Sequence, residues 1–372
     1  MIFPFICLYI IIFLLSLAEI FQHDVVKKRQ IGIFGLLVVF LFIGLRTEKV
    51  GADTSPYVSF FHDSRFYYLG EKTDIGFELI GRFLHLFGSS TEYFIFFSSA
   101  IMCYGLFFLI YKYSKNINFA LLFLCLVGTS SINLFMYMCM VRQCCALTFF
   151  FLSMYYLNEY GRKKIIISIL LYLMAIMTHG SILFTIPFVF LLFKYNFSKK
   201  IWISLIIITY ISAALSIINV GEILDRAFSL IGGLTSKDYS GYADVTFGQI
   251  EQKGFFNMNL LPFSIWGIIL CYLSQEKYLN CWFVKYFLLS ILLNNIFSDN
   301  QMWSRLILPF SLFVIIAVPY LTSKINKKHI IIPFYIVFFA YYIYKTISQL
   351  ISMSSPFATG NIVVPYEMWL FK

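Results

Sequence analysis

Hydrophobic runs separated by short polar connections make up most of this chain. None of the runs shows the alternation of a half-buried strand, and several approach the roughly 20 residues with which an α-helix crosses a bilayer. Because the bilayer core cannot hydrate a backbone, spanning segments are expected to be helices. Since some runs are short, they predict about ten to twelve transmembrane helices. The runs cover residues 2–20, 31–45, 92–111, 119–139, 143–157, 165–178, 180–193, 201–219, 258–274, 282–297, 306–322 and 329–347.

The composition is that of a membrane protein. The sequence is 60% hydrophobic and only 12% charged, whereas soluble domains carry about 25% charged residues. We therefore predict an all-α polytopic membrane protein, with residues 1–372 forming a single integral membrane domain. The net charge of +10 does not indicate a nucleic-acid partner, because the basic residues are dispersed in short clusters between the apolar runs.

The distribution of cations predicts the orientation of the chain. Alternate connections between the runs are rich in cations. The short connections of the opposite side, around residues 140–143, 179–180 and 298–305, carry only Arg142 and Arg305. By the positive-inside rule the cation-rich side is cytoplasmic, and the first run is a retained helix with its N-terminus outside. The cation-rich connections contain Lys27, Lys28, Arg29, Lys112, Lys115, Arg162, Lys163, Lys164, Lys194, Lys199, Lys200, Lys277, Lys324, Lys327 and Lys328.

Two long connections face outward in this topology, residues 46–91 and 220–257. Within the first, apolar residues recur at spacings of three and four over residues 74–88, which predicts a short helix lying in the membrane interface. The second contains several glycines among scattered charges, which is typical of a lid or of a plain connector.

Nine polar residues on the predicted outer side are candidates for a site. A guanidinium group can bind two phosphate oxygens at once through a pair of hydrogen bonds. Because three arginines of the outer side lie at the ends of predicted helices, we predict that they share a phosphate site. Aspartate and histidine are the candidates for removing a proton from a sugar hydroxyl. The candidates are Arg46, Asp53, Tyr57, Asp74, Glu78, Arg142, Gln143, His179 and Arg305.

Structural interpretations of the same residues stay open. Each arginine can simply extend to the membrane surface. Asp53 can form an Asx turn, and Asp74 can cap a helix. Glu78 can pair with Arg82 one turn further along a helix, and His179 can be a hydrogen-bonded loop residue.

The sequence gives no sign of a metal, cofactor or disulfide framework. The five histidines and eight cysteines lack ligand spacing, and the chain contains no phosphate-binding glycine loop or dinucleotide fingerprint. We therefore expect a reaction that uses side chains alone.

Several short motifs, in order, resemble the EpsG family of Wzy-type polysaccharide polymerases. The matching elements are Leu45-Arg46 with Val50-Gly51-x-Asp53-Thr54-x-x-Tyr57, Asp74-x-Gly76-Phe77-Glu78, Val141-Arg142-Gln143, Met177-Thr178-His179-Gly180-Ser181, Arg305 ahead of Leu308-Pro309, and more weakly Pro365-Tyr366-Glu367. The resemblance covers nearly the whole chain and implies a fold of the GT-C-like class.

This resemblance also implies an activity. The growing glycan would be moved from undecaprenyl pyrophosphate onto a sugar hydroxyl of an incoming lipid-linked repeat, at the outer face of the bacterial cytoplasmic membrane. Arg46, Arg142 and Arg305 would hold pyrophosphate, Asp53 or His179 would act as base or acceptor clamp, and Tyr57, Asp74, Glu78 and Gln143 would bind substrate. The implied partners are the lipid-linked donor and acceptor, membrane lipid, and a chain-length regulator protein.

Other classes of protein remain open. A flippase of lipid-linked sugars would also carry arginines, but its cations should face both leaflets. A membrane acyltransferase would use His179 as base, although no acidic residue lies near it in sequence. An inert scaffold gives no reason for polar residues to gather on one side.

Overall fold

The structure is a computed structural model that describes residues 2–64, 66–71, 73–126, 134–215, 260–297, 301–325, 328–354 and 363–371, without the side chains of 301–305, 328, 330, 331 and 371. The predicted outer loop 220–257 lies outside the described residues. Regular structure within these ranges is helical, and one isolated bridge pairs Arg46 with Met368. The predicted all-α class is therefore confirmed.

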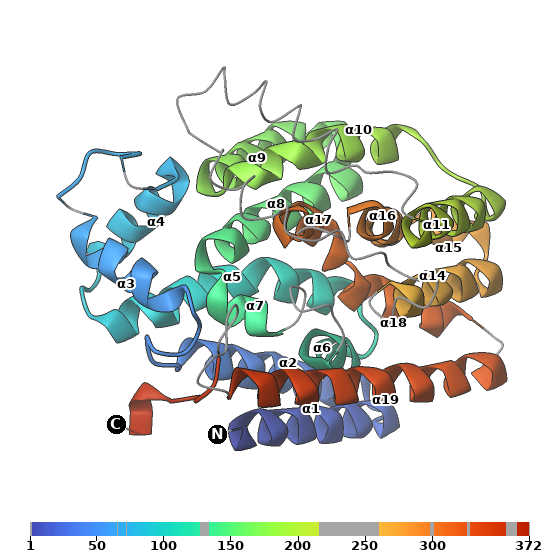
Figure 1. The fold of residues 1–372 in the computed structure, drawn as a ribbon, viewed down its shortest axis with the longest axis horizontal. Helices are drawn as coiled ribbons and strands as arrows, with labels where there is room; N and C mark the ends of the chain where they lie inside the picture. Colours follow the sequence, from blue (N-terminus) through green and yellow to red (C-terminus); the bar gives the residue numbers. More distant parts are fainter. Residues whose placement is uncertain are drawn as a thin grey trace. The chain divides into compact units, whose positions relative to one another are not determined.

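The helices follow one another along the chain as Figure 1 shows. They are α1 (Phe3–Phe21), α2 (Val25–Gly44), α3 (Thr54–Asp63), α4 (Ile75–His85), α5 (Thr91–Tyr113), α6 (Ile117–Leu126), α7 (Leu134–Cys139), α8 (Val141–Tyr160), η1 (Gly161–Lys164), α9 (Ile165–Thr178), η2 (Gly180–Thr185), α10 (Ile186–Lys194), α11 (Lys199–Ala214), α14 (Leu261–Leu273), α15 (Glu276–Leu279), α16 (Trp282–Phe297), α17 (Gln301–Ser311), α18 (Val314–Lys324), α19 (Lys328–Met353) and η3 (Trp369–Phe371).

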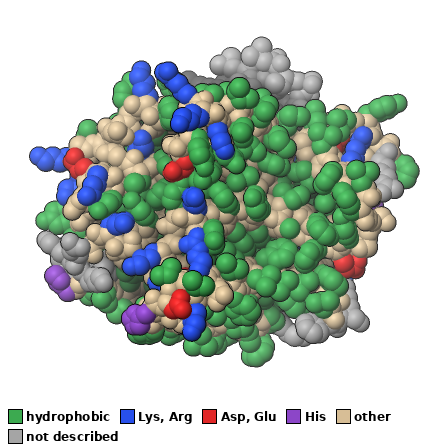
Figure 2. All heavy atoms as spheres, turned by 180° about the vertical axis from the view of Figure 1, so that it is seen from behind, with side chains coloured by type: hydrophobic (Ala, Val, Ile, Leu, Met, Phe, Trp, Pro, Cys, Tyr) green, Lys and Arg blue, Asp and Glu red, His purple; other side chains and the backbone are tan. Residues whose placement is uncertain are grey.

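Many of these helices are apolar enough to lie in a membrane. Four segments of the described chain are long and apolar enough to cross it, namely Phe3–Phe21, Thr91–Tyr113, Leu306–Lys324 and Ile332–Met353. Shorter apolar helices are Ile117–Leu126, Gly180–Lys194, Leu261–Leu273 and Trp282–Phe297. Hydrophobic side chains form broad areas of the face drawn in Figure 2. The chain is a polytopic membrane protein, and the number of its crossings stays a prediction.

Among the differences between the described helices and the predicted runs, two concern the run 306–322 and the first outer connection. The predicted run 306–322 is interrupted at Leu312 and Phe313, between α17 and α18. Pro309 lies in the last turn before this break, and a proline has no N–H for the helical ladder. The first outer connection holds two short helices, α3 as well as the predicted α4.

The chain divides into two compact units. The first contains Met1–Val189, Val314–Ser323 and Lys328–Lys372, and the second contains Phe190–Phe313 and Lys324–Lys327. In the first, α8 packs against α5 and α9, while α6 packs against α1, α2 and α19. In the second, α11 packs against α14 and α16, and α16 against α17. The single membrane domain stays a prediction.

A buried carboxylate fixes the start of α6 in the first unit. Glu19 of α1 is 1% exposed and accepts hydrogen bonds from the backbone amides of Ile117 and Asn118, both at 2.7 Å. The first amides of a helix have no partner in the helix itself, and its N-terminus favours negative charge. Glu19 therefore joins α1 to α6 by satisfying groups that the apolar surroundings would leave without hydrogen bonds.

Two cation-rich connections of the first unit meet at one end of its helices. The Arg29 guanidinium donates to the Tyr111 carbonyl at 2.6 Å and lies 3.6 Å from the centre of the Tyr111 ring. Lys112 follows Tyr111 directly. The connection after α1 and the one after α5 therefore share a side, as the charge distribution predicts.

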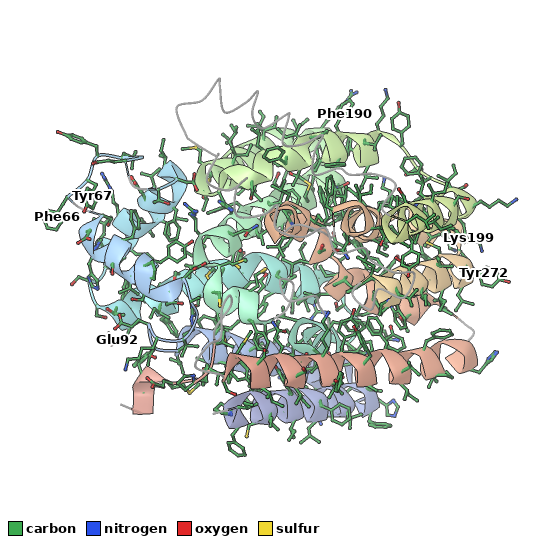
Figure 3. The ribbon with its side chains drawn as sticks, in the orientation of Figure 1. Phe66, Tyr67, Glu92, Phe190, Lys199 and Tyr272 are labelled. Carbon is green, nitrogen blue, oxygen red and sulfur yellow. The ribbon has the colours of Figure 1, made fainter. Side chains whose placement is uncertain are left out.

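In the second unit a buried lysine completes the end of α10. The Lys285 ammonium, on α16, donates to the Leu192 carbonyl and lies 3.2 Å from both the Tyr195 carbonyl and Asn196 Oδ1. A cation is favourable at a helix C-terminus, where carbonyls lack helical partners. At the neighbouring helices, Lys199 and Tyr272 lie side by side (Figure 3), with the ammonium 2.9 Å from the tyrosine carbonyl.

Removing the Glu19 carboxylate should destabilise the first unit. Glu19→Ala leaves two buried amides without acceptors, which typically costs about 1–3 kcal/mol. We expect a clearly lower thermal unfolding midpoint for the purified protein in detergent. Glu48→Ala, at a partly exposed position without a hydrogen bond in the described structure, is the control and should change little. Equal midpoints for the two variants would contradict the capping role.

Candidate functional site

Three of the predicted site residues, far apart in sequence, meet at one carboxylate oxygen. Arg142 Nη1 lies 3.2 Å from Asp74 Oδ2, and His179 Nδ1 lies 3.6 Å from the same atom. Arg142 Nη1 also donates to Thr73 Oγ1 at 2.7 Å. Side-chain exposure is 30% for Arg142, 23% for Asp74 and 19% for His179, so a ligand from outside can reach the cluster.

Each member of this cluster sits at a helix end. Asp74 directly precedes α4 in an extended conformation, Arg142 is in the first turn of α8, and His179 directly follows α9. The Asp74 side chain makes no capping hydrogen bond to α4. Asp74 therefore occupies the N-cap position of α4, as one interpretation expected, but its carboxylate faces Arg142 and His179 and does not cap the helix.

The glycine of the Asp-x-Gly-Phe-Glu segment allows α4 to approach α9. A Cβ added to Gly76 would lie 2.6 Å from the Thr178 amide nitrogen and 2.7 Å from the Met177 carbonyl carbon. Since real Cβ atoms do not come this close, only glycine fits without a shift of the backbone. The contact brings Asp74 next to His179, so two of the short motifs depend on each other.

Glu78 and Arg82 hold the turn that precedes Asp74. Glu78 is 1% exposed, and its oxygens accept from the Gly70 amide at 2.6 Å and the Thr73 amide at 3.3 Å. Arg82 donates to the Tyr67 carbonyl at 2.6 Å. In this structure the two side chains hold the backbone at Tyr67, Gly70 and Thr73, so Glu78 acts on the site by positioning Thr73 and Asp74.

The Val-Gly-x-Asp-Thr segment anchors the first outer connection to the backbone at Met138, which precedes α8. Gly51 has a φ of +98°, which favours glycine, and a Cβ there would lie 2.1 Å from the Met138 carbonyl oxygen. The Thr54 hydroxyl lies 2.9 Å from the carbonyl oxygens of both Val50 and Met138. This segment therefore fixes the stretch of chain that leads into α8.

Arg46 is enclosed rather than open to solvent. It is 0% exposed, and its Nη1 donates to the Ile43 carbonyl at 2.6 Å and to Ser99 Oγ at 2.9 Å. Within the described residues, Nε and Nη2 have no hydrogen-bond partner. Burial lowers the pKa of the guanidinium from its ordinary value.

The C-terminal segment covers Arg46. The Thr47 amide donates to the Glu367 carbonyl at 2.9 Å, and the Trp369 amide donates to the Leu45 carbonyl at 3.1 Å. The Tyr366 hydroxyl donates to the Phe42 carbonyl, and its ring stacks on Phe42 with centroids 4.2 Å apart. The weakest of the matching motifs, Pro365-Tyr366-Glu367, thus joins the C-terminal segment to the end of α2 and the Leu45-Arg46 motif.

The structure also places three of the remaining predicted residues, whereas the side chain of the fourth lies outside the description. Asp53 is half-buried at the start of α3, and its carboxylate makes no hydrogen bond within the described chain. The half-buried Tyr57 ring packs edge-on against Phe77, with centroids 5.3 Å apart. Gln143 is buried in the first turn of α8. The Arg305 side chain lies outside the described part, so its share in a phosphate site stays a prediction.

Sequence reasoning missed two features of the site. Thr73, the second partner of Arg142, was an unremarkable loop residue, although it stands next to Asp74. The acidic partner of His179 was also missed, because Asp74 precedes it by more than 100 residues. No group of three or more metal-ligating side chains occurs among the residues that the structure describes.

Comparison with models of known protein families gives a match that covers most of the chain. A model of the EpsG family matches residues 28–368. The chain belongs to the EpsG family. The resemblance noted from the motifs is therefore confirmed, and membership of the EpsG family associates the chain with Wzy-type polysaccharide polymerases and so with a polysaccharide polymerase role in general. Neither a curated protein nor a solved structure matches the chain.

A matched pair of glycine substitutions tests the packing that builds the site in this EpsG-family protein. Gly76→Ala should destabilise the protein by about 1–3 kcal/mol, because the new methyl group is forced against the α9 backbone. Gly180→Ala is the control, since nothing lies within 4 Å of a Cβ added there. Thermal unfolding of both purified variants measures the difference, and equal stability would show that α4 does not approach α9 as described.

Proposed function

We propose that the protein is a Wzy-type polymerase that joins lipid-linked oligosaccharide repeats. The growing glycan leaves undecaprenyl pyrophosphate and is transferred to a sugar hydroxyl of a second lipid-linked repeat. The observation that carries the proposal is the Asp74–Arg142–His179 cluster, a partly exposed group of one carboxylate, one guanidinium and one imidazole in a largely apolar protein of the EpsG family.

The Asp74–His179 pair suits the removal of a proton. The bond from the donor sugar to pyrophosphate breaks as the acceptor oxygen bonds to the same carbon, and the acceptor hydroxyl must release its proton. His179 takes this proton, and the Asp74 carboxylate orients the imidazole and stabilises its charged form. Their 3.6 Å separation is longer than a hydrogen bond, as is common before substrate binds.

Arg142 suits the stabilisation of the leaving pyrophosphate. Negative charge grows on the phosphate oxygens as the sugar departs, and a guanidinium held in place needs no reorganisation at that moment. Thr73 and Asp74 hold one edge of the Arg142 guanidinium, and the side chain remains 30% exposed. In this proposal Glu78 positions the turn that carries Asp74, while Arg46, Asp53, Tyr57, Gln143 and Arg305 belong to the wider substrate site.

The charge distribution supports an outward-facing site in the bacterial cytoplasmic membrane. The cation-rich connections near Arg29 and Tyr111 lie at the end of α2 and α5 that is opposite to Arg46 and Ser90. Under the positive-inside rule the Arg46 end is outside. Lipid-linked repeats in the outer leaflet would then be donor and acceptor, and a chain-length regulator protein is a candidate partner.

The Asp74–His179 pair also favours a second candidate, transfer of an acyl group to a sugar hydroxyl. An imidazole oriented by a carboxylate serves acyl transfer equally well. The absence of an acidic neighbour in sequence, which had weighed against this class, no longer does so. Purified protein given lipid-linked repeats together with an acyl thioester as acyl donor distinguishes the candidates: longer lipid-linked glycans favour the polymerase, and acylated repeats of unchanged length, with release of the thiol, favour the acyltransferase.

Removing the Asp74 carboxylate or the His179 imidazole should slow elongation strongly. Asp74→Asn and His179→Ala should each lower the rate constant of elongation by about 10²-fold or more, because general-base catalysis contributes on that order. The measurement is the length distribution of lipid-linked glycan formed by purified protein over time. Asp63→Asn, the same change at an exposed position, is the control and should retain full activity. Normal elongation by folded Asp74→Asn protein would refute the proposed role.

The charge of Arg142 alone should not suffice. Arg142→Lys keeps a cation but loses the planar guanidinium, whose Nη1 contacts Thr73 and Asp74 and whose other N–H groups would pair with phosphate oxygens. We expect elongation to fall by about tenfold or more in Arg142→Lys and further in Arg142→Ala, with Arg162→Lys, at an exposed cation of the opposite side, as control. Equal rates for wild type and Arg142→Lys would assign Arg142 to folding rather than to pyrophosphate.

A further inference from the structure

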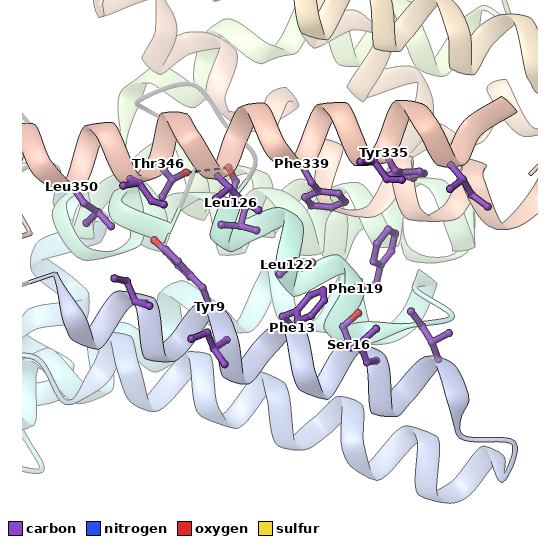
Figure 4. A pocket seen from close by; sticks show the side chains of 18 residues that line it. Tyr9, Phe13, Ser16, Phe119, Leu122, Leu126, Tyr335, Phe339, Thr346 and Leu350 are labelled. Carbon is purple, nitrogen blue, oxygen red and sulfur yellow. Dashed lines mark hydrogen bonds between the residues drawn. The ribbon is translucent and has the colours of Figure 1, made fainter. Parts of the chain in front are cut away.

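An apolar groove runs along the first unit between α1, α6 and α19 (Figure 4). Its volume is about 740 Å³. Its floor is made by buried side chains such as Leu122 and Leu126 of α6, whereas wall residues such as Ile10 and Ile336 are exposed by 53% and 65%. Both α1 and α19 contain candidate membrane spans that are mostly unburied, so the groove opens toward lipid.

Four polar side chains line the groove, those of Tyr9, Ser16, Tyr335 and Thr346, and the hydroxyls of all but Ser16 are turned to the protein. The Thr346 hydroxyl donates to the Leu126 carbonyl at 3.3 Å, and the Tyr335 and Thr322 hydroxyls are hydrogen-bonded to each other. The Tyr9 hydroxyl is inaccessible and has no partner in the described part of the chain. The groove therefore offers a hydrocarbon surface, and its occupant is a hydrocarbon chain rather than a sugar.

The length of the groove decides which hydrocarbon chain fits. Its residues on α1 run from Ile6 to Ile20, a helical rise of about 21 Å, and those on α19 run from Ile332 to Leu350, about 27 Å. An acyl tail of the outer leaflet reaches only the bilayer midplane, about 15 Å into a core of about 30 Å. A polyprenyl chain is one molecule long enough to follow the whole groove.

The lining suits a branched and unsaturated chain. Five aromatic rings, those of Tyr9, Phe13, Phe119, Tyr335 and Phe339, line the groove (Figure 4). Rings give large, rigid apolar contacts that methyl branches and double bonds can pack against. A straight, saturated acyl chain has no methyl branches or double bonds to pack against these rings.

One end of the groove leads to the segment that covers Arg46. Phe5, next to the groove residue Ile6, packs on Phe42 at 5.2 Å and on Tyr366 at 5.4 Å between ring centroids. Tyr366 belongs to the segment paired with residues 45–47. We propose that this groove binds the polyprenyl tail of the lipid-linked substrate, with the pyrophosphate end toward Arg46. The assignment rests on the proposed function.

Two neighbouring residues of α19 provide a matched test. Ile336 lines the groove, whereas Val337 does not, and their exposures are similar at 65% and 69%. Ile336→Trp should fill the groove and raise the KM for an undecaprenyl-linked repeat by about tenfold or more, which corresponds to about 1.4 kcal/mol. Val337→Trp should leave KM unchanged. With a geranyl-linked repeat, whose short tail needs little of the groove, both variants should resemble wild type.

A binding measurement keeps this test independent of polymerisation. Undecaprenyl pyrophosphate carrying a diazirine in its tail is irradiated with wild-type protein in phospholipid nanodiscs, and adducts are mapped by mass spectrometry. We expect labelling at groove residues such as Ile10 and Ile336 and little at Leu14 and Val337, which lie outside the groove. Excess phospholipid should not displace the label.

The outcomes separate the two proposals. Groove labelling without polymerisation by the purified protein would retain the tail site and refute the polymerase. Polymerisation with equal labelling at Ile336 and Val337, or with an unchanged KM in Ile336→Trp, would refute the tail site and retain the polymerase. Loss of the label to phospholipid would assign the groove to ordinary membrane lipid and also overturn the proposal.

Discussion

The Asp74 carboxylate is the group on which the arrangement of the site depends. One of its oxygens faces both Arg142 and His179, which come from connections far apart in sequence. A partly buried carboxylate is stable only where cations or donors surround it, and the same holds for the guanidinium beside it. The surrounding packing serves this requirement: Gly76 lets α4 approach α9, and Glu78 holds the turn before Asp74.

Buried charges away from this site have a different use. Glu19 satisfies amides at the start of α6, Lys285 satisfies carbonyls at the end of α10, and Arg46 satisfies the Ile43 carbonyl near the end of α2. Each charge has the sign that its helix end favours. In a chain with so few polar residues, helix ends inside the protein have little else to bond to, so Glu19 and Lys285 join helices and have no part in the proposed chemistry.

The sequence predicted local structure better than it predicted partners. The runs 165–178 and 282–297 coincide with α9 and α16, because hydrophobic length and flanking polar residues mark helix ends. The pairing of Leu45–Thr47 with the C-terminal segment joins residues that are far apart in sequence, and local sequence patterns contain no information about such contacts. The contact between Asp74 and His179 is likewise long-range, so local patterns could not predict it. Proximity in sequence had instead pointed to Asp53, between Arg46 and Tyr57, as the carboxylate of the site.

Arg46 and Arg142 differ in their access to solvent, so they cannot contribute to a phosphate site in the same way. Arg142 is accessible and already held in place, so an anion can meet it without rearrangement of the fold. Arg46 is fully buried, and two of its nitrogens lack partners among the described residues, a costly state for a cation in apolar surroundings. Phosphate oxygens would satisfy these nitrogens, but only if the segment around Tyr366 moved away from Phe42. In the proposed mechanism a pyrophosphate would therefore meet Arg142 first, and any contact with Arg46 would require the C-terminal segment to open.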